Sequence, residues 1–185
     1  MKRIAMTDAI WKILTAARST DKARLALHNI NIRPDSIEAT DGGRLIRVKR
    51  GDTVSIPEDV TPGVYRVITL EKMGRSLVGV IVEPEDAQYP ETDRVIPEHT
   101  DVGNKVSLPT KKNKKERDMA LSRAIIDIYV ATGRTIRAGY LEDLTPLDAD
   151  WHLSKPKESG PAGAIRMEAE GVTAVLMGMK EKKER

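Results

Sequence analysis

Two stretches of the chain have the hydrophobic spacing of an amphipathic helix. In each, four apolar residues recur at i, i+3, i+4 and i+7, which places them on one helix face. The first set is Ile10, Ile13, Leu14 and Ala17. The second is Leu121, Ala124, Ile125 and Ile128. The spacing predicts one helix from Thr7 or Asp8, either of which can be the N-cap, to about Arg18. It predicts another over about residues 114–131, with Gly133 as its C-terminal stop.

Most of the remaining chain alternates apolar and polar residues, as half-buried strands do. A short strand is expected at 2–6, before the first helix. After that helix, strands are expected at 26–33, 37–40, 44–48, 53–57, 64–70, 76–83 and, in irregular form, 88–99. Around the second helix they are expected at 101–109, 135–144, 148–156, 163–170 and 172–179. Residues 154–164 are rich in Pro and Gly and predict a loop, and KEKKER at 180–185 predicts a solvated tail.

The order strand–helix–strands therefore occurs twice, over half-repeats of about 1–98 and 101–180. Any two amphipathic helices can share the same offsets, so the shared order of elements carries more weight than the stripes. The expected fold class is α+β, with two helices packed on antiparallel sheets. We expect a single domain over residues 1–180 and a disordered tail at 181–185.

Composition describes a soluble protein, with 39% hydrophobic and 32% charged residues in 185. There is neither a membrane-length apolar run nor a signal-peptide layout, so a cytoplasmic location is expected. The absence of cysteine excludes disulfides and thiolate chemistry. His28, His99 and His152 lie far apart in sequence, which does not favour a metal site.

The stretch EATDGGRLIRVKRG at 38–51 could be mistaken for a phosphate or calcium loop. A phosphate loop opens a helix, however, whereas alternating strand residues follow here, and the spacing of calcium ligands is absent. We interpret it as a β-turn between two strands. No serine nucleophile motif occurs, and the carboxylates near Glu83 and Asp148 lie in charged loop-like stretches. The sequence predicts neither an enzyme nor a cofactor.

The net charge of +3 permits a polyanionic partner. Phe is absent and Trp and Tyr are few, which favours duplex DNA held by its phosphates over stacked single strands. Several basic residues lie on or before the predicted helices, off their apolar stripes. They are Lys12, Arg18, Lys114, Lys115, Arg117 and Arg123. An ordinary solvated helix face is the alternative interpretation.

Four segments resemble the bacterial sliding clamp, the processivity (beta) subunit of the replicative DNA polymerase. They are RSTDKARLALHNINI (18–32), EATDGGRLIRV (38–48), YPETDRVIP (89–97) and VTAVLMGMK (172–180). They occur in the family's order, and the resemblance spans about residues 2–180. It implies the DNA-clamp (processivity) fold, in which each domain is two copies of strand–helix–strands with inner helices facing duplex DNA.

The resemblance also implies two sets of binding residues. Lys12, Arg18, Arg24 and Arg123 match the basic inner helices, and Lys114, Lys115 and Arg117 join them as basic residues of the second helix region. The family's apolar peptide pocket, which receives linear motifs of replication and repair proteins, carries over to two segments. These are Thr40, Gly42, Gly43, Arg44 and Leu45, then Val175, Met177, Gly178 and Met179. A terminal strand packed on the core is the alternative for the two methionines.

This chain departs from the clamp pattern in several ways. A clamp chain carries three domains, whereas this one has room for about one, and in clamps the two halves of the pocket come from neighbouring domains. Gly43 stands where the family has His, and Gly178 where it has Pro. The expectation is a non-enzymatic clamp-like protein of replication or repair that forms a homo-oligomer. The most specific form of this expectation is a hexameric ring. The alternative is a peptide-binding adaptor or decoy that does not bind DNA.

Overall fold

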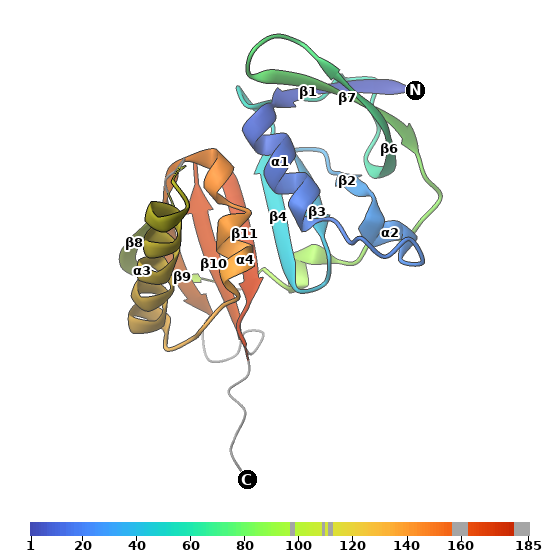
Figure 1. Ribbon diagram of the computed structural model, residues 1–185. Coiled ribbons are helices and arrows are strands. Elements are labelled where there is room, and N and C mark those ends of the chain that lie inside the picture. Colours follow the sequence, from blue (N-terminus) through green and yellow to red (C-terminus); the bar gives the residue numbers. More distant parts are fainter. Residues whose placement is uncertain (97–98, 109, 111–112, 157–162, 180–185) are drawn as a thin grey trace. The chain divides into compact units, whose positions relative to one another are not determined.

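The computed structural model in Figure 1 describes residues 1–96, 99–108, 110, 113–156 and 163–179. The chain forms two compact units, each described here by itself. The first comprises Met1–Glu91 and Gly171–Thr173, and the second Thr92–Glu170 and the chain from Ala174 onward. The expected tail at 180–185 and most of the expected loop at 154–164 lie outside the described residues.

The first unit is an antiparallel sheet with one helix packed on it. Its elements are β1 (Lys2–Thr7), α1 (Asp8–Ala17), α2 (Leu25–His28), β2 (Ile30–Ile32), β3 (Ser36–Thr40), β4 (Arg44–Lys49), β5 (Val54–Ser55), β6 (Gly63–Lys72) and β7 (Leu77–Pro84). The strand order is β5-β1-β7-β6-β2-β3-β4, and all neighbours in it are antiparallel. The Thr7 hydroxyl accepts a hydrogen bond from Ile10 N at 3.3 Å and caps α1, as expected.

The predicted apolar stripe of α1 is buried against this sheet. Ile10, Ile13, Leu14 and Ala17 are all buried, together with Trp11, and α1 contacts β1, β3, β4 and β7. Burying five apolar side chains along ten residues anchors the helix, because its own propensity would not hold so short a segment. The stripe prediction is confirmed for this helix.

The second unit repeats the strand–helix–strands order. Its elements are η1 (Thr92–Arg94), β8 (His99–Leu108), α3 (Lys114–Thr132), α4 (Ala138–Glu142), η2 (Thr145–Leu147), β9 (Ala149–Pro156), β10 (Ala164–Ala169) and β11 (Val172–Met177). The strand order is β11-β10-β9-β8, and α3 contacts β8, β9 and α4. Helix α3 ends at Gly133, whose φ of 68° is left-handed, so the predicted glycine stop is confirmed.

Three strand predictions are wrong. Residues 26–33 divide into α2 and the shorter β2, because His28 N bonds to Arg24 O at 2.9 Å and closes a helical turn. Residues 135–144 contain α4, in which Leu141 is buried; Leu144, two residues beyond the helix, is buried at the i, i+3 spacing from it. In 88–99, Val95 N and Ile96 N both bond to Thr92 O, so η1 forms at Thr92–Arg94, and residues 88–91 before it are in no strand. Short apolar runs do not distinguish a helical turn from a strand by period alone.

Candidate partner-binding surfaces

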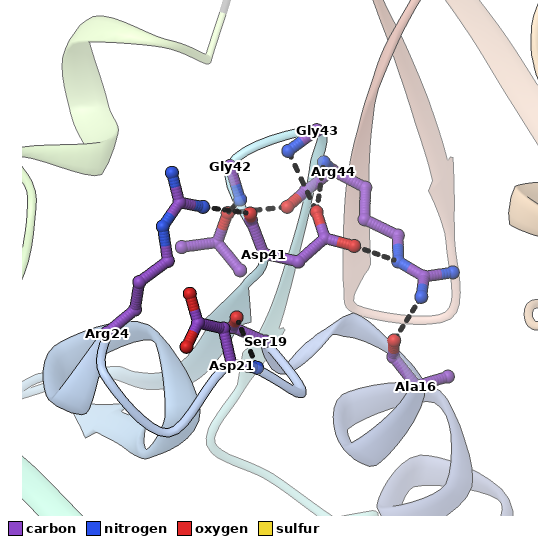
Figure 2. A network of polar contacts seen from close by, with 9 residues as sticks. Ala16, Ser19, Asp21, Arg24, Asp41, Gly42, Gly43 and Arg44 are labelled. Atoms are coloured by element: carbon purple, nitrogen blue, oxygen red, sulfur yellow. Dashed lines mark hydrogen bonds and ion pairs between the residues drawn. The ribbon is translucent and has the colours of Figure 1, made fainter.

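The turn between β3 and β4 is held by its own side chains (Figure 2). Asp41 Oδ1 accepts hydrogen bonds from Gly43 N at 2.8 Å and Arg44 N at 3.0 Å. Thr40 Oγ1 accepts from Gly42 N at 3.1 Å and donates to Arg44 O at 2.5 Å. Gly42 has a φ of +90°, a backbone angle that favours glycine. The predicted β-turn is therefore fixed by an Asx-type network that needs no ligand.

Arg44 joins this turn to the end of α1. Its Nε lies 3.1 Å from Asp41 Oδ2, and its Nη2 donates to Ala16 O in the last turn of the helix. A cation there complements the negative end of the helix dipole. Across the turn, Arg24 Nη1 donates to Asp41 O at 3.3 Å. The Arg44 side chain is only 12% exposed, so it stabilises the turn from within.

The five sequence-predicted residues of this turn therefore differ in what they offer a partner. Thr40 and Leu45 are buried, Gly43 and Arg44 are half-buried, and only Gly42 is exposed. Gly43 N–H is already bonded to Asp41.

The other predicted pocket segment, at the end of β11, presents apolar side chains. Val175 is 2% exposed, whereas Met177 is 38% and Met179 51% exposed. The backbone between them is pinned: Gly178 N donates to Gly163 O at 2.6 Å, and Met179 N to Thr135 O at 2.9 Å. The two methionines are thus held at alternate positions of the segment that ends β11 and follows it, with part of each side chain in solvent.

Gly178 is fixed by close packing of backbone. A Cβ at this position would lie 2.8 Å from Gly163 O and 3.4 Å from Thr135 O. A proline, which the clamp pattern has here, would also lack the N–H that Gly178 donates. The two pocket segments belong to different units: the turn to the first, and residues 175–179 to the second.

Several of the predicted DNA-binding cations have partners within the chain. Lys12 Nζ lies 2.6 Å from Asp8 Oδ2 one turn earlier on α1. Arg18 Nε donates to His28 O at 2.7 Å, and burial lowers the pKa of its guanidinium. Arg117 Nη1 lies 3.2 Å from Glu142 Oε1. Arg18 and Arg117 therefore tie helices to neighbouring segments.

The remaining predicted cations are exposed, and one of them, Arg24, also makes the hydrogen bond to Asp41 O described above. Arg24, Lys114, Lys115 and Arg123 all lie on the surface. Arg123 has 86% of its side chain exposed, and its Nε lies 3.9 Å from Asp127 Oδ2, at the outer limit of an ion pair. Among the seven, these four and Lys12 are the ones available for phosphate contacts.

Sequence reasoning missed a buried charged cluster around Glu38 on β3. The Glu38 side chain is fully buried; Arg47 Nε and Asn31 Nδ2 each donate to it at 2.8 Å, and Arg33 Nη1 lies 3.7 Å away. Burial, and then the charge of Glu38, raises the pKa of Tyr89. IEAT was predicted only as a strand, and the structure shows that all five residues of β3 are buried.

Sequence reasoning also missed an apolar surface on α3. Met119, Ile126, Tyr129 and Val130 are large and exposed. A signal was present in the sequence, since apolar residues recur outside the buried stripe of this helix.

Within the part of the chain that the structure describes, no group of His, Asp or Glu residues is arranged to hold a metal ion. None of the described helices has the length and apolar character needed to cross a membrane.

The order of elements and the antiparallel sheets define a clamp-like α+β fold, as predicted. Solved structures that match it include bacterial DNA polymerase III beta sliding clamps. The sliding clamp of Bacillus subtilis aligns over 97% of this chain and 64% of its own, at 16% identity and a TM-score of 0.53. The beta subunit from Borrelia burgdorferi aligns over 97% and 63%, at 11% identity and a TM-score of 0.59.

A third match, the beta subunit from Pseudomonas aeruginosa, has 12% identity and a TM-score of 0.54 over 97% of this chain and 67% of that one. This chain spans less than two thirds of the first two clamps. No protein-family model and no curated protein matches the sequence. At such identities the likeness shows the fold alone.

Proposed function

We propose that this chain is a non-enzymatic, clamp-like protein of DNA replication or repair that holds a linear peptide of a partner at Met177 and Met179. One observation carries the proposal. Two partly exposed methionines lie at alternate positions of the segment at the end of β11, and backbone hydrogen bonds hold that segment in place. Flexible thioether side chains adapt to peptides of different shape.

A peptide titration followed at the methionine methyl groups tests this proposal. The protein is labelled with ¹³C at its methionine methyls, and a clamp-binding peptide from a bacterial replicative polymerase is added. The Met177 and Met179 signals should shift, while the Met119 signal should not. Replacing both residues with Gln should weaken binding at least tenfold, and Met119→Gln should leave it unchanged. Equal affinity in the double variant would show that the β11 end is not the site.

Duplex DNA is a second candidate partner, favoured by the exposed cations Lys12, Arg24, Lys114, Lys115 and Arg123 on a chain of net charge +3. Contacts through Lys and Arg would be independent of base sequence and sensitive to salt. An adaptor or decoy that keeps the fold without binding DNA is the alternative, and duplex binding at low salt separates the two.

A further inference from the structure

Helix α3 has two apolar faces. Leu121, Ala124 and Ile128 are buried on the face that packs on its own unit. Residues two or five positions away point to the opposite face of a helix. There Met119 is 57%, Ile126 60% and Val130 75% exposed. Single exposed apolar residues are ordinary, but a row of them along one helix marks an interaction surface.

A second set of five residues on this side of α3, two of them polar, has the spacing of a helix-pairing seam and shares Met119 and Ile126 with the exposed row. Lys115, Met119, Ser122, Ile126 and Tyr129 follow one another at steps of four, three, four and three residues. This is the period that keeps one side of a helix against a second helix. The small Ser122 lies at the centre of the row, where a partner backbone could approach closely.

A shallow groove of about 780 Å³ runs along this seam. All its lining residues belong to α3 or to its N-cap Asn113, between Asn113 and Ile126. Its volume would suit a small molecule, but one face of one helix cannot enclose a ligand. An elongated occupant that lies along the helix fits this shape, as in helix-in-groove recognition.

Charge indicates the chemistry of that occupant. The groove lining has three cations, Lys114, Lys115 and Arg123, against one carboxylate, Asp118. Both lysines lie in the first turn of α3, where the helix dipole is already positive and cations are unfavourable. An acidic partner would neutralise the excess of positive charge in the groove and would relieve the unfavourable placement of the two lysines at the helix N-terminus. A second copy of this face would instead bring cations against cations.

We propose that the outward face of α3 is a docking site for an acidic amphipathic helix of a partner protein. Its apolar residues would cover Met119 and Ile126, and its Asp or Glu residues would pair with Lys114, Lys115 and Arg123. Duplex DNA would use the same cations but would leave the apolar row without a role. This inference does not depend on the peptide site at β11.

The test selects binders from a phage-displayed library of 21-residue amphipathic helices, using the full chain. Selected peptides should carry large apolar residues at i, i+3, i+4 and i+7, with acidic residues beside them. For one such peptide, fluorescence anisotropy should show at least a tenfold loss of affinity on Met119→Gln with Ile126→Gln. Lys114→Glu with Lys115→Glu should weaken it at least threefold. The matched control, Ile68→Gln with Met73→Gln, changes exposed residues of the first unit and should have no effect.

Four results would overturn the proposal. The first is a selection that yields no acidic amphipathic peptide, and the second is a selected peptide that binds the Met119/Ile126 variant as tightly as the original chain. A 24-base-pair duplex that competes with the peptide through the lysines, while the peptide ignores the apolar substitutions, would assign the face to DNA. A dimer in light scattering that Ile126→Gln dissociates would assign it to a second copy.

Discussion

At the scale of single residues, the departures from the clamp pattern have different physical grounds. The backbone N–H of Gly43 donates to Asp41 within the turn, and this bond does not itself require a glycine at the position. Gly178, in contrast, is required by its surroundings, since Gly163 O accepts its N–H and occupies the space beside its Cα. Proline is therefore excluded from this position in this chain. Because Gly178 has no side chain, the backbone between Met177 and Met179 can pack directly against Gly163 O.

Gly178→Ala should lower the free energy of unfolding by about 2 kcal/mol, because the new methyl group would overlap Gly163 O and force the backbone apart. Urea denaturation measures the change. Gly139→Ala is the matched control: Gly139 lies in α4, and its added Cβ would meet no heavy atom within 4 Å. The control should be neutral or slightly stabilising. Equal losses in both variants would mean that the packing at Gly178 is not the cause.

At the scale of elements, regular periodicity was enough to locate most of the sheet and both long helices. The stripe of α1 and the glycine stop of α3 followed from residue spacing alone. The short helices α2 and α4 could not be found this way, because one or two turns contain too few residues to show a period. The outer row of α3 was missed for a different reason. Met119 and Ile126 lie opposite the buried stripe, and a single-stripe interpretation treats that face as solvated.

The contact between the β3–β4 turn and α1 was also beyond sequence pattern, since Arg44 and Ala16 are 28 residues apart. Arg44→Ala should cost about 2 kcal/mol of stability, because charge-assisted hydrogen bonds to Asp41 and Ala16 O are lost. Amide exchange should accelerate in residues 41–44 and the last turn of α1. Thermal unfolding and hydrogen exchange measure both effects.

The control for this change is Arg75→Ala, which removes an exposed arginine between β6 and β7. Its stability should remain within about 0.5 kcal/mol of the original. Should Arg44→Ala be equally mild, or should exchange increase throughout the first unit alike, the side chain would not be a local connection between turn and helix.

At the scale of the whole molecule, the clamp-like fold does not identify the binding partner. Of the seven cations that sequence reasoning assigned to DNA, Arg18 and Arg117 are engaged with His28 O and Glu142. The pattern could not show this, because both partners are distant in sequence. Reversing either charge would disturb the fold as well as any interface. Lys12 and Arg24 are better probes, since both are exposed and both belong to the first unit, whereas the apolar row of α3 belongs to the second.

If duplex DNA is a partner, a 24-base-pair duplex should bind at low salt, with log K falling linearly as log salt rises. Lys12→Glu with Arg24→Glu should remove two phosphate contacts and reduce that slope by about 1.8, at roughly 0.9 per contact. Lys72→Glu with Lys22→Glu makes the same change of net charge at other exposed positions and should leave the slope nearly unchanged. Fluorescence anisotropy over a salt series measures all three proteins.

An equal loss of slope in both double variants would indicate attraction by net charge, and no binding at low salt would favour the adaptor. A loss confined to Lys12 and Arg24 would place the duplex on the first unit and leave α3 free for a protein helix.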